Sequence, residues 1–331
     1  MLLVVVFHYC LVLATAASSP NVILFMPDDM HHLWSESPPS VSGDVFQPDS
    51  SLIPHMQRVR NEGAVFMNAY VAGPKCAPSR YNVLTGRYCS TSVYSTSGQY
   101  ASSTSGNYTR FPVTVPACKL SGDDETTNIQ TMLSNAGYTT IHSGKWHLAE
   151  KNVGGYDDYD GTVTAVKNTG FTEVASVYYT NMDKNDYNFS HNVEWTVNTS
   201  IAKMEEAVAA DNPFFLYFAH TIPHAPSNEE ALCNFSVKST PAGWLDEEPA
   251  TTMPSRQSIL DRAYSSDSSW RDTSIGTIWV DDSLGALMTS LEALGVLDNT
   301  IIIVTQDHGQ LAKNTLYQVI FASLVSLLLC V

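Results

Sequence analysis

Short apolar runs alternate with amphipathic segments along this chain. The runs contain β-branched or aromatic residues and have the length of buried strands; they lie at residues 21–26, 138–142, 213–219 and 301–305. Helices are predicted between them, at 52–62, 128–136 and 194–210, and across Leu284, Leu287, Met288, Leu291 and Leu294, whose spacing makes one apolar helical face. The alternation predicts an α/β fold with a mainly parallel central sheet and helices on both faces.

Three polar stretches interrupt this pattern. Residues 89–110 are rich in Ser, Thr, Tyr and Gly and are predicted to form a long surface loop. Residues 151–193 are acidic and aromatic and are expected to contain loops, and residues 225–274 are polar without a regular period. Asp281 and Asp282 are interpreted as acids near the start of the last helix, where the helix dipole favours negative charge. Specificity for a ligand is expected on the three polar stretches.

Length and charge narrow the class of protein. The 331 residues suffice for one large α/β domain or two modest ones. The formal net charge of −16 argues against a nucleic-acid partner, because the phosphate backbone would be repelled. An anionic substrate would therefore need a local pocket of cations.

The N-terminal residues have the features of a secretory signal peptide. Apolar runs within residues 1–17 are followed by Ala-Thr-Ala-Ala at 14–17, a cleavage site of small residues. A transmembrane anchor is the alternative, but the run is broken at residues 8–9 and is short for a span. Four N-x-S/T sequons agree with secretion: Asn107, Asn188, Asn198 and Asn234. We expect the secretory pathway, with a secreted or lysosomal-type destination.

The six cysteines do not have the spacing of a zinc site. Cys10 lies in the signal peptide and Cys330 in an apolar C-terminal tail. Cys89, Cys118 and Cys233 can form one disulfide and leave one thiol, but the pairing cannot be read from the sequence.

Acidic residues follow the first and the last predicted strands. Asp28 and Asp29 come directly after the first strand, and Asp307 and His308 follow the last one. Carboxyl ends of parallel strands meet at one edge of a sheet, where ligands bind. Three carboxylates gathered there would repel each other unless a cation joined them, and oxygen ligands select calcium or magnesium. The alternative is that these are solvated loop acids.

Residues 76–87 carry the most specific motif of the chain, C-x-P-S-R-x-x-x-L-x-G-R, with seven fixed positions. Pro78 suits the first turn of a helix. Cys76 would then lie just before a helix N-terminus, where free N–H groups and the dipole favour an anion, and Arg80 adds a positive charge. The motif resembles the signature of the sulfatases, in which the cysteine is oxidised to formylglycine. The alternative is a helix start with an incidental buried cysteine.

Two further segments resemble motifs of the same family. The letters GKWHL at 144–148 are similar to its second signature, G-K-W-H-L-G, with Ala149 in place of the final glycine. The letters PHAP at 223–226 look like its P-H-x-P turn. The resemblance implies that Lys145 binds a sulfate oxygen, that His147 acts as a base, and that His224 binds sulfate and protonates the leaving group. Lys313 looks like the last lysine of the family pattern and would make a second contact to the ester oxygen.

The resemblance also implies a cofactor set and a reaction. Calcium, or sometimes magnesium, would be held by the side chains of Asp28, Asp29, Cys76, Asp307 and His308. The hydrated formylglycine at position 76 would attack sulfur and displace the alcohol. The enzyme would be a sulfuric ester hydrolase acting on a sulfate ester of a sugar, polysaccharide or aryl alcohol. A formylglycine-generating enzyme would be its partner during maturation.

Two other functions stay open at this point. One is hydrolysis of a phosphonate or phosphate monoester, since the wider alkaline-phosphatase-like superfamily shares the central sheet and the use of metal ions bound by acidic residues. The other is an inactive, truncated secreted homologue that only binds sulfated ligands.

The resemblance assigns residues 20–317 to an N-terminal catalytic domain of sulfatases. Members of the family usually continue well past the strand that ends in D-H-G, so we expect the C-terminal subdomain to be missing from this chain. Residues 318–331 form an apolar tail of unassigned role, shorter than the roughly 20 residues that a membrane span needs.

Overall fold

The protein is described from a computed structural model. It describes residues 19–30, 50–66, 69–73, 75–96, 118–120, 126–149, 154–182, 187–265, 271–308 and 323–325. The predicted signal peptide, the sequon at Asn107 and Lys313 lie outside these residues. Among the helices in the described ranges, none combines the length and the apolar character needed to cross a membrane.

A seven-stranded sheet forms the centre of the molecule, in the order β2-β9-β8-β1-β5-β3-β4. Its strands are β1 (Asn21–Asp28), β2 (Gly63–Val65), β3 (Thr139–Lys145), β4 (Glu173–Tyr178), β5 (Phe214–Pro223), β8 (Thr300–Val304) and β9 (Ser323–Val325). The five strands from β8 to β4 pair in parallel, whereas β9 pairs antiparallel with β8 and β2. Residues 323–325 of the apolar tail thus belong to this sheet.

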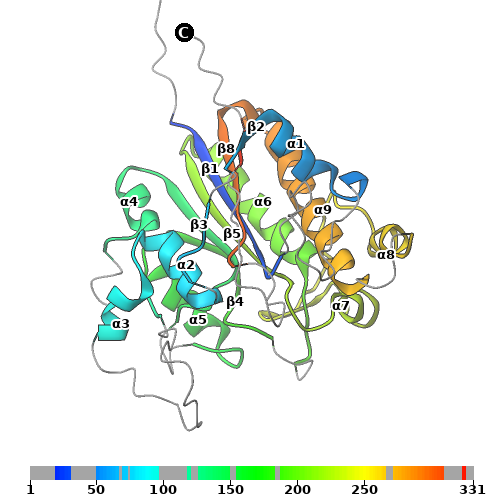
Figure 1. Cartoon of the computed structure of the whole chain (residues 1–331), viewed down its shortest axis with the longest axis horizontal. Coiled ribbons are helices and arrows are strands. Elements are labelled where there is room, and N and C mark those ends of the chain that lie inside the picture. Colours follow the sequence, from blue (N-terminus) through cyan, green and yellow to red (C-terminus); the bar gives the residue numbers. More distant parts are fainter. Residues whose placement is uncertain are drawn as a thin grey trace, which may run out of the picture.

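Helices cover both faces of the sheet, as Figure 1 shows. On one face lie α1 (Pro54–Glu62), α6 (Val193–Ala209), α7 (Asn228–Asn234), α8 (Arg256–Tyr264) and α9 (Arg271–Ala293). On the other face lie α2 (Cys76–Thr85), α4 (Ile129–Asn135) and α5 (Tyr159–Lys167). The short helix α3 (Val93–Thr96) and the hairpin of β6 (Ser239–Thr240) and β7 (Gly243–Trp244) are peripheral. The predicted α/β class, with a mainly parallel sheet covered on both faces, is confirmed.

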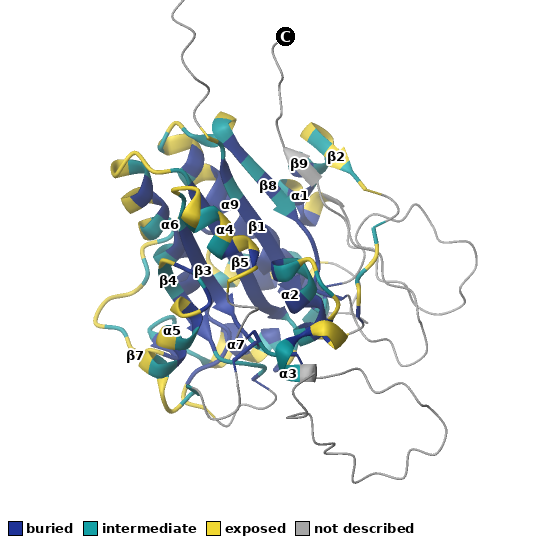
Figure 2. Cartoon of the chain, turned by 90° about the vertical axis from the view of Figure 1, so that its left-hand side faces the viewer, coloured by how far each residue is buried: buried dark blue, intermediate teal, exposed yellow. Residues whose placement is uncertain are grey.

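Two hydrophobic cores lie on opposite sides of the sheet because successive side chains of a strand point to opposite faces. In β1, Ile23 and Phe25 enter the core under α6 and α9, and Leu24 and Met26 enter the core under α2. Strand β5 divides its apolar side chains in the same way. Figure 2 shows these strands as a continuous buried layer, with exposed residues on the outer faces of the helices. A strand buried on both faces needs an unbroken apolar sequence.

The predicted strands and helices are all present. Most of their bounds are shifted by no more than four residues, but the last helix, predicted across residues 284–294, already begins at Arg271. The prediction for residues 151–193 was incomplete, because this stretch contains α5 and β4. The polar stretch 225–274 likewise contains α7 and α8, and each begins at a serine that caps the helix through its hydroxyl. In both regions the amphipathic pattern of a helix extends over short segments only. The polar composition of the whole stretch therefore concealed the helical period of 3.6 residues. Of the predicted loop 89–110, residues 89–91 form a 3-10 helix and 93–96 form α3.

The interpretation of Asp281 and Asp282 was wrong. Both lie deep within α9, not near its start. The carboxylate of Asp281 accepts the backbone N–H groups of His55 and Met56, at 3.1 and 2.7 Å, and so caps the first turn of α1. Asp282 pairs with Arg262 of α8. Asp281 does serve a helix start, but that of a helix more than 200 residues earlier in the chain.

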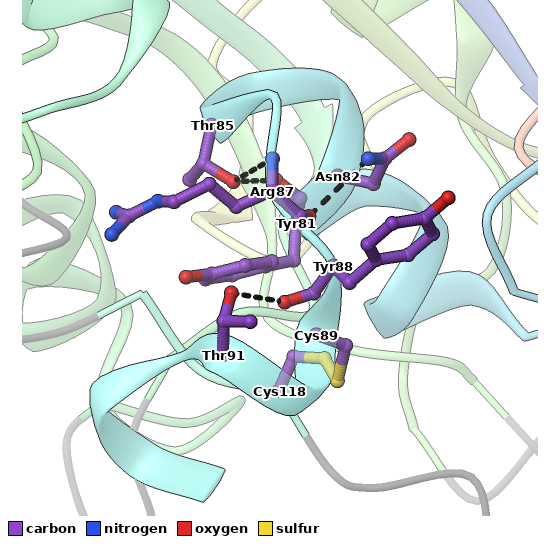
Figure 3. The surroundings of a disulfide bond; sticks show 8 residues. All are labelled: Tyr81, Asn82, Thr85, Arg87, Tyr88, Cys89, Thr91 and Cys118. Atoms are coloured by element: carbon purple, nitrogen blue, oxygen red, sulfur yellow. Dashed lines mark hydrogen bonds between the residues drawn. A yellow bond between two sulfur atoms is a disulfide. The ribbon is translucent and has the colours of Figure 1, made fainter. Parts of the chain in front are cut away.

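A disulfide between Cys89 and Cys118 resolves the pairing that the sequence left open. Cys233 carries a free, exposed thiol. Helix α2 ends at Gly86, whose φ of 67° is in the left-handed region that glycine adopts without strain. Figure 3 shows the disulfide directly beyond this turn, beside Tyr81 of α2. The bond joins the chain after α2 to residues 118–120 and so fixes the C-terminal end of that helix.

Candidate active site

The site lies where four neighbouring strands end. Asp28 closes β1, Lys145 closes β3, His224 directly follows β5, and Asp307 follows β8. The order β8-β1-β5-β3 places these ends side by side, at the carboxyl edge of the sheet. Helix α2 brings its N-terminus to the same edge, with Cys76 as its first residue.

The five side chains that the sequence groups as metal ligands come together. One ligand atom from each of Asp28, Asp29, Cys76, Asp307 and His308 can be chosen so that all lie within 4.8 Å of one another. The Nε2 atom of His308 is 3.1 Å from Cys76 Sγ and 3.1 Å from Asp29 Oδ1. That the cluster binds a metal remains a prediction.

Two buried cations face these acids. Arg80 Nη2 is 3.1 Å from Asp28 Oδ1 and 3.2 Å from Asp307 Oδ2. Lys145 Nζ is 2.6 Å from Asp28 Oδ2. Burial would raise the pKa of Asp28, but Lys145 and Arg80 outweigh it and hold that pKa well below its ordinary value. Asp28 is therefore a carboxylate at neutral pH.

The other two acids are less well compensated. Burial, and next the charge of Asp28, raise the pKa of Asp29 and bring that of Asp307 to about 6. The buried Oδ1 of Asp29 lies 3.1 Å from Nε2 of His308 and accepts no other hydrogen bond from the described residues. Among the described residues, three carboxylates thus face two fixed cations, Arg80 and Lys145. Such an oxygen-rich, under-compensated set fits a hard divalent cation.

Cys76 is a poor nucleophile in its unmodified form. Its side chain is buried, with 8% of the residue exposed. Burial, and next the charge of Asp28, raise the pKa of the thiol to about 12. The thiolate is the reactive form of cysteine, so position 76 needs another chemical form to attack an ester.

His147 lies at the same edge in a conformation that its neighbours impose. Its φ is 60°, uncommon outside glycine, and its backbone N–H donates to the carbonyl of Tyr179 at 2.9 Å. Gly144, just before it, approaches β5 so closely that a Cβ would lie 1.9 Å from the Ala219 carbonyl oxygen. Burial, and next Lys145 and Arg80, lower the pKa of His147 to about 2, so its imidazole is neutral.

His224 sits beside the acids on a turn that contains two cis prolyl peptides, at Pro223 and Pro226. Its backbone N–H donates to the carbonyl of Asp28 at 3.1 Å. Its Nε2 is 3.6 Å from Asp29 Oδ2, and the side chain is 16% exposed. His224 thus faces the cluster from its more open side.

Some residues that shape the site carried no role in the sequence analysis. The hydroxyl of Ser79, a fixed position of the 76–87 motif, donates to the backbone carbonyl of Asp307 and joins α2 to the end of β8. Arg80 also has a buried Nε with no partner in the described part of the chain. His220 lies in the core, where its ring packs edge-on against Phe25 and Phe218. The motif includes Ser79 as a fixed position, but the sequence does not predict that its hydroxyl contacts Asp307.

Comparisons with known proteins cover most of the chain. A family model described as Sulfatase matches residues 20–320. N-acetylgalactosamine-6-sulfatase from Homo sapiens is 25% identical over 312 residues, covering 89% of this chain and 51% of the human protein. N-acetylglucosamine-6-sulfatase from Capra hircus is 26% identical over 330 residues, covering 89% and 52%. The chain therefore spans about half the length of these curated relatives.

Solved structures show the same fold at low identity. BT4656, solved in complex with its substrate D-glucosamine-2-N,6-O-disulfate, has a TM-score of 0.53 and 19% identity, covering 92% of this chain and 71% of that one. The lipoteichoic acid synthase LtaP from Listeria monocytogenes has a TM-score of 0.51 and 14% identity, covering 93% and 66%. Because proteins with different names share this architecture, the likeness extends to the fold alone.

Proposed function

The chain belongs to the sulfatase family, and we propose that it hydrolyses a sulfate ester of a sugar, polysaccharide or aryl alcohol. One observation carries the proposal: Cys76, at the N-terminus of α2, lies in one buried cluster with Asp28, Asp29, Asp307 and His308. A nucleophile position, a site for a divalent cation and two fixed cations are thereby gathered within one site.

Cationic groups bind the sulfate. Arg80 and Lys145 are almost completely buried, so their charges act in a medium of low dielectric constant. The N-terminus of α2 offers free backbone N–H groups beside position 76. His224 faces the same space, and Lys313 is proposed as a further contact to the ester oxygen.

Two groups complete the proposed chemistry. Calcium, or alternatively magnesium, would be held by the acids, His308 and the side chain at position 76, and when bound it would polarise a sulfate oxygen. Formylglycine made from Cys76 by a formylglycine-generating enzyme would supply a geminal hydroxyl as nucleophile. The raised pKa of the unmodified thiol supports this modification.

The chain's own histidines move the protons. His224, with its Nε2 towards the cluster, donates a proton to the leaving alcohol oxygen. His147, a neutral ring whose buried Nδ1 has no hydrogen-bond partner among the described residues, is the proposed acceptor of a proton from the group at position 76. Arg80 and Lys145 hold the sulfate while Asp28 holds both cations in place.

We assign the protein to the secretory pathway, as a secreted or lysosomal-type enzyme. The Cys89–Cys118 disulfide supports an oxidising compartment. The sequon residues Asn188 and Asn234 are exposed, whereas Asn198 is half-buried within α6. Digestion with an N-glycosidase should shift the mass of protein from a eukaryotic host, and the sugars should map to the exposed sites.

Mass spectrometry of the peptide that carries Cys76 tests the proposal. Protein made in a host with the maturation machinery should have lost about 18 Da at that residue, the change from thiol to aldehyde that nucleophile activation requires. An unmodified thiol there would contradict the catalytic proposal and favour an inactive homologue.

A turnover comparison separates the two ester classes. The protein should hydrolyse an aryl sulfate faster than the matching aryl phosphate, and chelation should remove the activity until calcium is restored. Equal or faster phosphate turnover would favour the phosphonate or phosphate monoester hydrolase instead. Within the described ranges a single cluster has metal-type ligands, which favours the sulfate ester over a two-metal phosphatase.

A further inference from the structure

A buried histidine outside the catalytic cluster bridges the turn that carries His224. His191 precedes α6 and is 1% exposed. Its Nδ1 lies 2.7 Å from the hydroxyl oxygen of Thr221, and its Nε2 lies 3.0 Å from the carbonyl oxygen of Pro226. Thr221 is three residues before His224 and Pro226 two residues after it. One imidazole ring therefore spans both ends of the turn.

The hydrogen-bonding partners determine the protonation state of this ring. The Pro226 carbonyl can only accept, so His191 Nε2 must carry a proton and donate it. In a neutral ring Nδ1 is then the acceptor for the Thr221 hydroxyl. Burial lowers the pKa of His191 to about 4, which agrees with a neutral ring. Both nitrogens are used, so the ring cannot rotate without losing a bond.

Other bonds hold the backbone of the same turn from different sides. The N–H of His224 donates to the Asp28 carbonyl at 3.1 Å. The side-chain amide of Asn228 donates to the Pro223 carbonyl at 3.2 Å and to Asp272 at 3.1 Å. These bonds each hold one point of the turn. His191, in contrast, fixes the separation between the strand end and the residue beyond His224.

We propose that His191 is a positioning residue that holds the turn so that the His224 imidazole meets the leaving oxygen. The inference rests on the proposed role of His224 as proton donor. Displacing a proton donor costs most when the leaving group needs the proton. A nitrophenolate leaves readily without one, whereas a sugar alkoxide does not. Loss of the bridge should therefore act selectively on esters with poor leaving groups.

Two substitutions remove one bond each. His191→Gln can place its amide N–H at the position of Nε2, towards Pro226, but it has no acceptor at the position of Nδ1, because its oxygen is bonded to the same terminal carbon as the nitrogen. Thr221→Val removes the hydroxyl while keeping the side-chain shape. For each we expect kcat to fall about 10- to 100-fold on a sugar sulfate and about 2-fold on nitrophenyl sulfate, the cost of a displaced proton donor. Because both break the same bond, the double variant should cost little more than the worse single one.

His55→Gln is the matched control. His55 is half-buried on α1, and its backbone is held by Asp281 of α9. Any loss it causes should be the same for both substrates. An equal loss on both substrates for His191→Gln and Thr221→Val would reduce His191 to a structural residue and overturn the proposal.

A second measurement does not require turnover. Long-range ¹H–¹⁵N spectra of the histidine rings should show His191 as a neutral ring protonated at Nε2, and the His224 signals should move in both variants. Unchanged His224 signals would overturn the positioning role even in a protein without activity. Absence of sulfate-ester turnover by the wild type, together with shifted His224 signals, would instead sink the proposed function and leave the bridge intact.

Discussion

The Nζ atom of Lys145 lies 2.6 Å from Oδ2 of Asp28, and both side chains are 1% exposed. The second oxygen of the same carboxylate receives Arg80 at 3.1 Å. Asp28 thus holds two cations in place before any anion arrives. A buried carboxylate with two cationic partners keeps its charge, and each partner is indispensable because removal leaves an uncompensated buried charge.

Replacing Lys145 with methionine should destabilise the protein. Lys145→Met keeps most of the side-chain volume but leaves Asp28 with Arg80 alone, and removal of one partner of a buried pair costs roughly 3 kcal/mol. Urea unfolding without added metal measures this. Lys203→Met is the control: Lys203 pairs with Glu206 on the surface at 2.7 Å, and such pairs contribute less than about 1 kcal/mol. Equal effects of the two substitutions would contradict this account of the site.

Cys76→Ser should stop the reaction at a covalent sulfated intermediate. The serine hydroxyl can attack sulfur, but unlike a geminal diol it has no second hydroxyl with which to expel the sulfate. We expect less than one turnover and a stable sulfated serine, seen by mass spectrometry as a modified peptide covering position 76. Repeated turnover by the variant would refute the need for an aldehyde.

The Cys89–Cys118 disulfide should stabilise the protein and the end of α2. The paired Cys89→Ala and Cys118→Ala variant should lose about 2–4 kcal/mol, as is typical for a crosslink that closes a loop of this size. Thermal unfolding measures the loss. Cys233→Ala, at an exposed free thiol, should change stability by no more than about 0.5 kcal/mol. A similar result for both would show that the crosslink is absent in solution.

His220 should make the fold sensitive to acid. Burial, and next Arg80, lower the pKa of His220 to about 3, whereas in the unfolded chain the pKa is near its ordinary value of about 6.5. Between these values the unfolded chain binds one more proton, so stability is present above about pH 6.5 and is lost as the pH falls towards 3. The expected slope is about 1.4 kcal/mol per pH unit at most.

His220→Gln retains a polar group that can reach the hydroxyl of Ser283, 2.9 Å from Nε2 in the wild type, but it does not titrate. Free energies of unfolding measured from pH 4 to pH 7 should therefore depend less steeply on pH in the variant. A slope that the substitution leaves unchanged would mean that His220 is not buried in solution.

The sequence predicted most of what lies at the carboxyl edge of the sheet. Asp28 and Asp307 follow strands buried on both faces, and such strands are easy to recognise because nearly every residue is apolar. When β1 and β8 pair in parallel, their carboxyl ends lie at the same edge of the sheet, so Asp28 and Asp307 come close together. The motif at 76–87 and the PHAP turn then added Cys76 and His224 without any knowledge of contacts.

The parts that could not be predicted depend on partners far away in the chain. Asp281 caps a helix 225 residues earlier, and no local pattern distinguishes it from an acid that serves its own helix. His191 looks like an ordinary loop residue until β5 and the following turn are placed against it. The choice of Cys118 over Cys233 as the partner of Cys89 also depends on the finished fold.

The pairing of β1 with β8 has a consequence for the order of events during synthesis. Asn21, which opens the first strand, is aligned with Thr300, which opens β8. Asp28 and Asp307 therefore cannot meet until the ribosome has released nearly three hundred further residues. Up to that moment Cys76 lacks Asp307 and His308, two of the four side chains with which it later forms the cluster. An enzyme that modifies this cysteine would have access to it during that interval, while translation continues.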